Sequence, residues 1–183
     1  MKQQLQAGVT LVLGGARSGK SAFAEGLVLG SGLQPVYLAT GQAWDTEMES
    51  RISLHQQRRG SEWKTVEAPL DLCDAVLANA TSGNALLLDC LTLWITNLMM
   101  AEADITMEVE RLAAKIGGLQ SPLVVVSNET GLGIVPDNAM ARAFRDHAGL
   151  ANQKIAAIAR TVWFVAAGLP MLFKNDETNQ DRK

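Results

Sequence analysis

The sequence predicts an α/β fold of the P-loop NTPase type, with a mostly parallel β-sheet flanked by helices and an antiparallel edge strand near the C-terminus. Two observations predict it. Short apolar runs alternate with helix-length segments along most of the 183 residues, as in parallel sheets with crossover helices. The first run, residues 9–13, leads directly into Gly-Gly-Ala-Arg-Ser-Gly-Lys-Ser at Gly14 to Ser21, which is the pattern of a phosphate-binding loop.

Short, branched apolar runs bounded by turn residues predict strands that are buried on both faces. In chain order, strands are expected at residues 9–13, 35–39, 63–66, 85–88, 123–126, 162–166 and 171–174. Segments of helical composition lie between them, at 21–28, 45–59, 70–80, 91–100, 107–116 and 138–158. This alternation places helices on both faces of the sheet.

Some of these elements carry more specific signals. Thr46 and Glu49 form a capping box at the start of the 45–59 helix, and Gly149 predicts an irregularity in the last helix. The link at residues 168–170 is too short for a crossover helix, so the last strand is expected to run antiparallel on an edge.

The composition fits one compact domain without a broad nucleic-acid-binding surface. The formal net charge is −3 and 48% of the residues are apolar, which allows one substantial core but does not favour the basic face that nucleic-acid phosphates need. We therefore expect a single catalytic domain over residues 1–174, a polar, disordered tail over 175–183, and no nucleic-acid partner.

Cysteine usage and hydropathy indicate a cytoplasmic protein. Cys73 and Cys90 have neither metal-ligand spacing nor the density of a disulfide-stapled fold, so reduced, buried thiols are expected. The N-terminus lacks the apolar core of a signal peptide. The most apolar stretch, residues 85–101, is interrupted by Asp89 and Asn97 and is shorter than the ~20 residues that span a bilayer, so no stable membrane insertion is expected.

Each residue type in the loop from Gly14 to Ser21 has a separate task in binding a nucleoside triphosphate. Glycines let the backbone curl so that its N–H groups converge on phosphate oxygens. The Lys20 ammonium is expected to reach the β and γ phosphates, and the Ser21 hydroxyl to ligate Mg²⁺. The helix that follows directs its positive N-terminal end at the same anion.

Two carboxylates are expected at the carboxyl ends of strands, where ligands of such sheets bind. Asp89 follows the 85–88 strand and fits a Walker B acid that holds Mg²⁺, although acids also cap strands simply to reach solvent. Glu129 follows the 123–126 strand and lies beside Gly131 and Gly133. A functional role is favoured for Glu129, because two glycines beside an acid suggest close backbone approach to a ligand, although a tight turn would also explain them.

The sequence has two histidines, His55 and His147. His55 shares a helix with Arg51, Arg58 and Arg59, and nearby cations favour a neutral imidazole that can act as a nucleophile or base. From the spacing alone, a half-exposed histidine on a charged helix explains His55 better, and His147 has a weaker case still.

A set of short motifs lies in order along the chain from about Val9 to Lys174. They are the loop at residues 14–21, the strand end Ala39-Thr40, Arg51-Ile52 before His55, Trp63, Glu67, Asn128-Glu129-x-Gly-x-Gly-Ile-Val-Pro136, and Phe144-Arg145-Asp146-x-Ala-Gly149-x-x-Asn152-Gln153. Together they resemble the bifunctional adenosylcobinamide kinase and adenosylcobinamide-phosphate guanylyltransferase family of cobalamin biosynthesis.

The resemblance implies a RecA-like fold, a homotrimer, and two reactions on a corrinoid. ATP or GTP phosphorylates adenosylcobinamide, and GTP then transfers GMP to that phosphate through a guanylyl-histidine, which falls on His55, releasing pyrophosphate and leaving adenosylcobinamide-GDP. It implies that His55 and Lys20 are catalytic and that Ser21 and Asp89 hold Mg²⁺. Nucleotide contacts fall on Gly14, Gly15, Ala16, Arg17, Ser18, Gly19, Lys20, Ser21, Thr40, Gly41, Gln42, Gln56, Gln57, Arg58, Arg59, Glu67 and Asp89.

Two alternative functions remain open at this point. A small-molecule kinase would use the same loop without a covalent intermediate, and a nucleotide-dependent switch would hydrolyse nucleotide without any effect of a corrinoid. The sequence contains no Asn-Lys-x-Asp segment of the kind that reads a guanine base in GTPase switches. The corrinoid-binding residues are not evident, although apolar residues near 91–100 are candidates.

Overall fold

A computed structural model of the protein describes residues 5–42 and 60–176, and its centre is a seven-stranded sheet in the order β3-β2-β4-β5-β1-β6-β7. The strands are β1 (Gly8–Gly14), β2 (Gln34–Ala39), β3 (Lys64–Glu67), β4 (Asn84–Asp89), β5 (Pro122–Asn128), β6 (Thr161–Ala166) and β7 (Leu169–Asn175). Every expected strand is present. All neighbours pair in parallel except β6 and β7, which confirms the predicted antiparallel edge.

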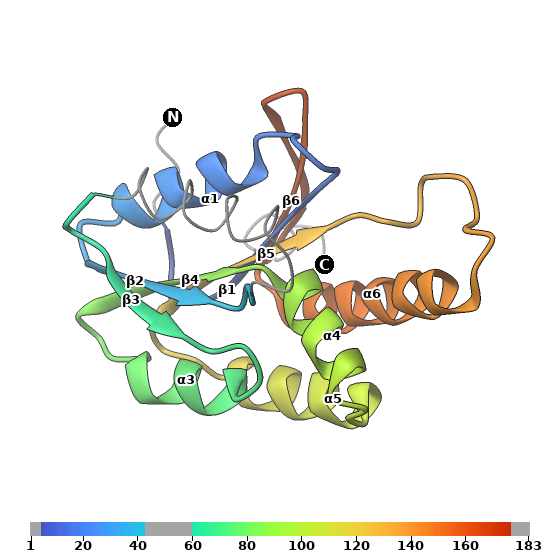
Figure 1. The fold of residues 1–183 in the computed structure, drawn as a ribbon. Coiled ribbons are helices and arrows are strands. Elements are labelled where there is room, and N and C mark those ends of the chain that lie inside the picture. The colour runs from blue at the N-terminus through green and yellow to red at the C-terminus, as the bar shows by residue number, and fades with distance from the viewer. Residues whose placement is uncertain (1–4, 43–59, 177–183) are drawn as a thin grey trace.

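Helices cover both faces of the sheet, as Figure 1 shows. Helix α1 (Lys20–Leu29) lies alone on one face among the described helices. The other face carries α3 (Leu72–Asn79), α4 (Leu91–Met100), α5 (Ile105–Ile116) and α6 (Ala139–Ile158). The sheet therefore separates two apolar layers, because successive residues of each strand point to opposite faces.

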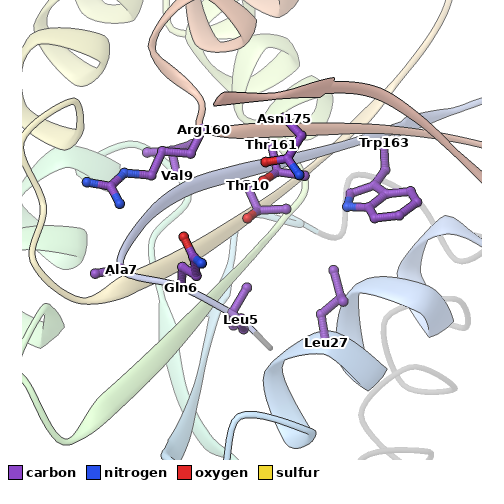
Figure 2. A pocket seen from close by; sticks show the side chains of 10 residues that line it. All are labelled: Leu5, Gln6, Ala7, Val9, Thr10, Leu27, Arg160, Thr161, Trp163 and Asn175. Carbon is purple, nitrogen blue, oxygen red and sulfur yellow. The ribbon is translucent and has the colours of Figure 1, made fainter. Parts of the chain in front are cut away.

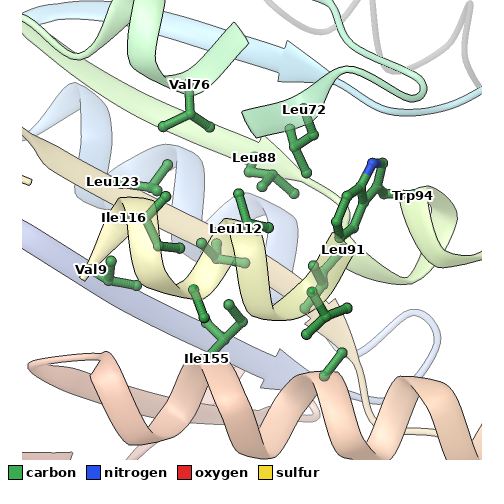
Figure 3. Close-up of a cluster of buried hydrophobic side chains, with 14 of the residues drawn as sticks. Val9, Leu72, Val76, Leu88, Leu91, Trp94, Leu112, Ile116, Leu123 and Ile155 are labelled. Atoms are coloured by element: carbon green, nitrogen blue, oxygen red, sulfur yellow. The ribbon is translucent and has the colours of Figure 1, made fainter. Parts of the chain in front are cut away.

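The larger apolar layer lies between the sheet and helices α3 to α6. Leu88 and Leu123 from the strands meet Leu112 and Ile116 from α5 and Ile155 from α6, and all five side chains are fully buried (Figure 3). The smaller layer packs α1 through Ala24 and Val28 against the opposite face. Burial on both faces explains why the central strands have continuous rather than alternating apolar sequences.

The structure corrects several predicted boundaries. Helix α6 runs without interruption through Gly149, so the expected irregularity is absent; a Cβ added there would meet no other atom within 4 Å. The turn before β7 is tighter than expected, because Ala167 and Gly168 have positive φ and Leu169 already pairs with Ala166. Strand β7 also continues to Asn175, which moves the start of the expected tail beyond that residue.

Other expectations are met or fall outside the described residues. Cys73 and Cys90 are free and buried, as predicted. Among the helices in the described ranges, none has the length and apolar character needed to cross a membrane. The predicted 45–59 helix with its capping box, and residues 177–183 of the tail, lie outside the described residues.

Candidate functional site

The loop between β1 and α1 has the conformation that its glycines were expected to permit. Gly14 ends β1, Lys20 begins α1, and Gly19 occupies the left-handed region with φ 93°. The Ser18 amide donates to the Gly15 carbonyl at 3.3 Å, so the backbone turns back on itself. Arg17 also has a positive φ, of 56°. This curl leaves the first turn of α1 open to an anion beyond the carboxyl end of β1.

Position 14 has room only for glycine. A Cβ at Gly14 would lie 2.5 Å from the Val165 carbonyl oxygen and 2.5 Å from Ser18 Oγ. The neighbouring hairpin turn also supports the loop, since the Gly168 amide donates to the Ser18 carbonyl at 2.8 Å. Sequence reasoning missed this support from the β6–β7 turn, and the glycine in that turn was its only visible signal.

Lys20 lies at the base of the loop, close to Asp89 and Cys90. The residue is 8% exposed and its ammonium donates to the Gly15 carbonyl at 3.1 Å. Burial lowers the pKa of Lys20, whereas the Cys90 thiolate, where it forms at alkaline pH, and the Asp89 carboxylate act in the opposite direction. The lysine of the loop and the acid at the end of β4 therefore lie close enough for their charges to interact.

A buried hydrogen-bond network joins the ends of β2 and β4. The Thr40 hydroxyl pairs with both the amide and the carbonyl of Cys90, the residue that follows Asp89. Asn97 of α4 donates through Nδ2 to the Thr40 carbonyl at 2.7 Å and to the Pro69 carbonyl at 2.9 Å. These contacts fix the backbone directly after Asp89, and no local sequence pattern predicts them.

A second polar cluster lies at the end of β5, next to the loop. Asn128 Nδ2 donates to Thr92 Oγ1 at 2.8 Å, and that hydroxyl lies 3.1 Å from Cys90 Sγ. Asn152 of α6 accepts from the buried Ser127 hydroxyl and donates to the Asn128 carbonyl. Burial and the Asp89 charge raise the pKa of Cys90 to about 11, so its thiol is neutral near pH 7.

Glu129 is part of a tight turn that is bonded to the phosphate loop. Its amide donates to the Gly14 carbonyl at 3.1 Å. Its carboxylate accepts from the Gly131 amide at 2.6 Å. The turn interpretation therefore explains Glu129 and Gly131, and the carboxylate has a structural contact within its own loop.

The predicted nucleotide contacts fall into three groups. The residues from Gly14 to Ser21, Thr40, Gly41, Gln42 and Asp89 lie at or just beyond the carboxyl ends of β1, β2 and β4. Glu67 ends β3 beside Ala39, at the same edge but separated from β1 by β2, β4 and β5. His55, Gln56, Gln57, Arg58 and Arg59 lie outside the described residues.

A small cavity at the opposite end of the strands does not suit a nucleotide. It is lined by Val9 and Thr10 of β1, Thr161 and Trp163 of β6, and Leu27 of α1, among others (Figure 2). Its volume of about 40 Å³ is enough for one or two water molecules. Nucleotide chemistry therefore belongs at the other edge, where the phosphate loop lies.

Comparisons with known proteins agree with this geometry. Residues 10–173 match the family model described as cobinamide kinase / cobinamide phosphate guanyltransferase. The bifunctional adenosylcobalamin biosynthesis protein CobP of Pseudomonas aeruginosa is 46% identical over 168 residues, covering 91% of this chain and 97% of that protein.

Solved structures share the fold at low identity. The flagellar accessory protein FlaH of Methanocaldococcus jannaschii superposes with a TM-score of 0.55 at 13% identity, covering 94% of this chain and 80% of that one. The RadB recombinase superposes with a TM-score of 0.52 at 14% identity, covering 87% and 75%. These likenesses support a RecA-like P-loop fold.

Proposed function

Because the chain belongs to the cobinamide kinase / cobinamide phosphate guanyltransferase family of bifunctional enzymes, we propose that it phosphorylates adenosylcobinamide and then transfers GMP from GTP to the new phosphate. The observation that carries this proposal is the phosphate loop at the carboxyl edge of the sheet, with Lys20 and Asp89 in one electrostatic environment. That arrangement binds a triphosphate and stabilises charge as phosphorus is transferred.

In the first step, the terminal hydroxyl of the aminopropanol arm attacks the γ phosphorus of ATP or GTP. A new P–O bond forms between the hydroxyl oxygen and the γ phosphorus, and the bond from the γ phosphorus to the leaving ADP or GDP breaks. The hydroxyl proton is lost to a base or water. Lys20 offsets charge on the bridging and leaving oxygens, and the amides of the loop hold the phosphates in place. The buried position of Lys20 strengthens that electrostatic interaction.

We propose that Ser21 and Asp89 hold the Mg²⁺ ion that accompanies the triphosphate. The two residues supply a hydroxyl and a carboxylate, and oxygen donors of these kinds suit this ion. Within the described ranges, no group of three or more His, Cys, Asp or Glu side chains forms a metal site, so the described acids and Ser21 would supply only part of its coordination. When bound, the ion neutralises phosphate charge in both steps.

In the second step, a neutral His55 nitrogen attacks the α phosphorus of GTP. An N–P bond forms and the bond to pyrophosphate breaks; the substrate phosphate then displaces histidine and yields adenosylcobinamide-GDP. The family resemblance supports the assignment of His55, with Gln56, Gln57, Arg58 and Arg59 as nucleotide contacts. One nucleotide site then presents two phosphorus atoms to two nucleophiles.

Thr40 stays a predicted nucleotide contact and has a second role in this proposal. It is fully buried and its hydroxyl is bonded to the Cys90 backbone, so the hydroxyl positions the neighbouring Asp89. Gly41, Gln42 and Glu67 stay predicted nucleotide contacts. A homotrimer, a cytoplasmic location and the absence of a nucleic-acid partner also stay predictions, and the resemblance and the sequence composition are their support.

The test is covalent labelling with GTP that carries ³²P at the α position, in the presence of Mg²⁺. Wild-type protein is expected to retain label through an acid-labile, base-stable bond, and His55→Ala to retain none. His147→Ala is the matched control. It changes the second histidine of the sequence, which lies on α6, and the variant should be labelled normally. Label retained by His55→Ala would refute the assignment.

A parallel measurement separates the two activities. With γ-labelled nucleotide and adenosylcobinamide, His55→Ala is expected to keep transferring phosphate to the corrinoid. Corrinoid phosphorylation by wild-type protein without any α-labelled adduct would reduce the proposal to a plain kinase. Nucleotide hydrolysis that is insensitive to corrinoid would favour a switch.

A further inference from the structure

An apolar arm projects from the edge of the sheet that carries the phosphate loop. Residues 129–138 connect β5 to α6 and extend beyond the first turn of α6 (Figure 1). Within this arm, the side chains of Leu132, Ile134 and Val135 are 81%, 98% and 59% exposed. Residues 130–136 contain no ionisable side chain. A group of large, exposed apolar side chains marks a binding surface.

The arm is fixed at both ends. At its start, the Glu129 amide is bonded to the Gly14 carbonyl and the Glu129 carboxylate closes the turn at Gly131. At its end, the Arg142 guanidinium donates to the carbonyls of Pro136 and Asp137, at 3.0 and 2.8 Å. The Asn138 side chain caps α6 by accepting from the Ala141 amide. These bonds anchor the backbone at both ends of the arm, which lowers the entropic cost of ordering it on a ligand.

An apolar groove adjoins the end of the arm. It has a volume of about 330 Å³ and is lined by Thr96 and Met99 of α4, by Asn138, and by Met140, Ala141 and Phe144 of α6. All of these lining residues are uncharged, and methionine adapts to irregular ligand shapes. Thr96 and Met99 belong to the 91–100 segment considered as a corrinoid surface, whereas Leu91, Trp94 and Ile95 of that segment are fully buried in the core.

We propose that the arm and the groove bind the corrin macrocycle of the substrate while its aminopropanol hydroxyl reaches the phosphate loop. This inference rests on the proposed function. The acceptor hydroxyl must meet the γ phosphorus, so the body of the molecule has to lie on a surface next to Gly14, and the arm is bonded to Gly14. A corrin ring presents apolar faces and neutral amide groups, which match the uncharged residues 130–136 of the arm and the uncharged groove.

A second copy of the chain is the competing occupant of this surface. A substrate surface needs to lie next to the phosphate loop, whereas a self-association surface does not. The arm begins where β5 pairs with the end of β1 at Gly14, and this position favours the corrinoid. The experiment below measures both occupants.

The test compares wild-type protein with the double variant Leu132→Ser/Ile134→Ser. Equilibrium dialysis with adenosylcobinamide, in the presence of a non-hydrolysable GTP analogue, measures corrinoid affinity by its visible absorbance. We expect a loss of roughly tenfold or more, because two apolar side chains no longer contact the macrocycle. Affinity for a fluorescent GTP analogue and the sedimentation coefficient should stay at wild-type values.

Met107→Ser is the matched control, since Met107 is also an exposed, large apolar residue but belongs to α5. It is expected to leave corrinoid affinity unchanged. Unchanged corrinoid affinity in the double variant would overturn the inference, and so would a shift to smaller species in sedimentation, which would assign the arm to self-association. If the double variant is less stable, Ile134→Ser alone, at a position that packs against almost nothing, decides the question.

Failure of the proposed function gives a different result. If wild-type protein neither binds nor phosphorylates adenosylcobinamide, the function itself is wrong. If wild-type protein does both and the arm variants behave like it, only the assignment of the arm is wrong.

Discussion

The Thr40 hydroxyl donates a hydrogen bond to the Cys90 carbonyl at 2.8 Å and accepts one from the Cys90 amide at 2.9 Å. One buried side chain thus satisfies both backbone groups of the residue that follows Asp89. Strands β2 and β4 are neighbours in the sheet, and this pair of bonds joins their carboxyl ends where the nucleotide is proposed to bind. Thr40 is therefore a positioning residue for Asp89.

Thr40→Val is expected to destabilise the protein and to impair nucleotide turnover. Valine has the shape of threonine but cannot hydrogen-bond, so the Cys90 amide loses its partner while the Cys90 carbonyl keeps the Trp94 amide, at a cost of about 1–3 kcal/mol. Urea unfolding measures that loss. The Mg²⁺ concentration for half-maximal kinase activity should rise as well, because Asp89 is no longer held in place.

Thr40→Ser is the matched control for this prediction. It keeps the hydroxyl and removes one buried methyl group, which costs about 1 kcal/mol. Its Mg²⁺ dependence should stay that of the wild type. An equal Mg²⁺ dependence in the valine and serine variants would show that the hydroxyl does not position Asp89.

Gly14→Ala and Gly15→Ala are expected to differ, although both change a glycine of the phosphate loop. A Cβ at Gly14 meets the Val165 carbonyl oxygen and Ser18 Oγ at 2.5 Å each, whereas a Cβ at Gly15 meets no atom within 4 Å. In nucleotide-free protein, Gly14→Ala should lose about 1–3 kcal/mol or more of unfolding free energy. Gly15→Ala should stay within about 0.5 kcal/mol of wild type. Equal stabilities would contradict the packing account of Gly14.

The sequence predicted the parts of this fold whose causes are local. The central strands are continuous apolar runs because both faces of the sheet are covered. The phosphate loop can be recognised because its residue types and their spacing are those that bind phosphate. The Thr40–Cys90 pair could not be predicted, because residues 50 positions apart become neighbours only when β2 lies beside β4. The same holds in part for Gly14, because one of the two atoms that leave no space for a Cβ there belongs to Val165 of β6.

Some features were misjudged because the contacts that decide them cannot be seen in the sequence. Gly149 is a poor helix former, yet α6 continues through it because Ala148, Ala151 and Asn152 on the same helix are buried. Glu129 stood beside glycines that fitted either a ligand site or a turn, and only the bond from its carboxylate to the Gly131 amide shows the turn.

The buried Cys90 thiol is expected to make protein stability fall at alkaline pH. An ordinary cysteine has a pKa of 9.0, whereas burial, with a further contribution from Asp89, raises the pKa of folded Cys90 to about 11. Between these values the unfolded chain has lost a proton that the folded protein keeps, so unfolding becomes more favourable as pH rises. The stabilisation is fully present below pH 9 and is lost towards pH 11, by roughly 2–3 kcal/mol.

Cys90→Ala provides the comparison for that slope. Below pH 8 the variant should be less stable than wild type by a constant amount, because it leaves a small cavity. From pH 9 to 11 the two urea-unfolding curves should converge, since only the wild type has the Cys90 thiol. Parallel curves over this range would show that Cys90 titrates alike in folded and unfolded protein.

The affinity for nucleotide is expected to fall as pH rises, and to begin falling at a lower pH than it would if Lys20 had the pKa of an ordinary lysine. Burial lowers the pKa of Lys20 below its ordinary value of 10.5, although an ionised Cys90 thiol and the Asp89 carboxylate oppose that shift. Only the protonated ammonium attracts the phosphates, so affinity declines as pH passes the lowered pKa of the free protein. Titration of a fluorescent GTP analogue from pH 7 to 10.5 measures this decline. Lys20→Arg stays charged throughout, and its affinity, although weaker, should lack that decline. A variant that followed the wild-type pH profile would show that a group other than Lys20 controls binding.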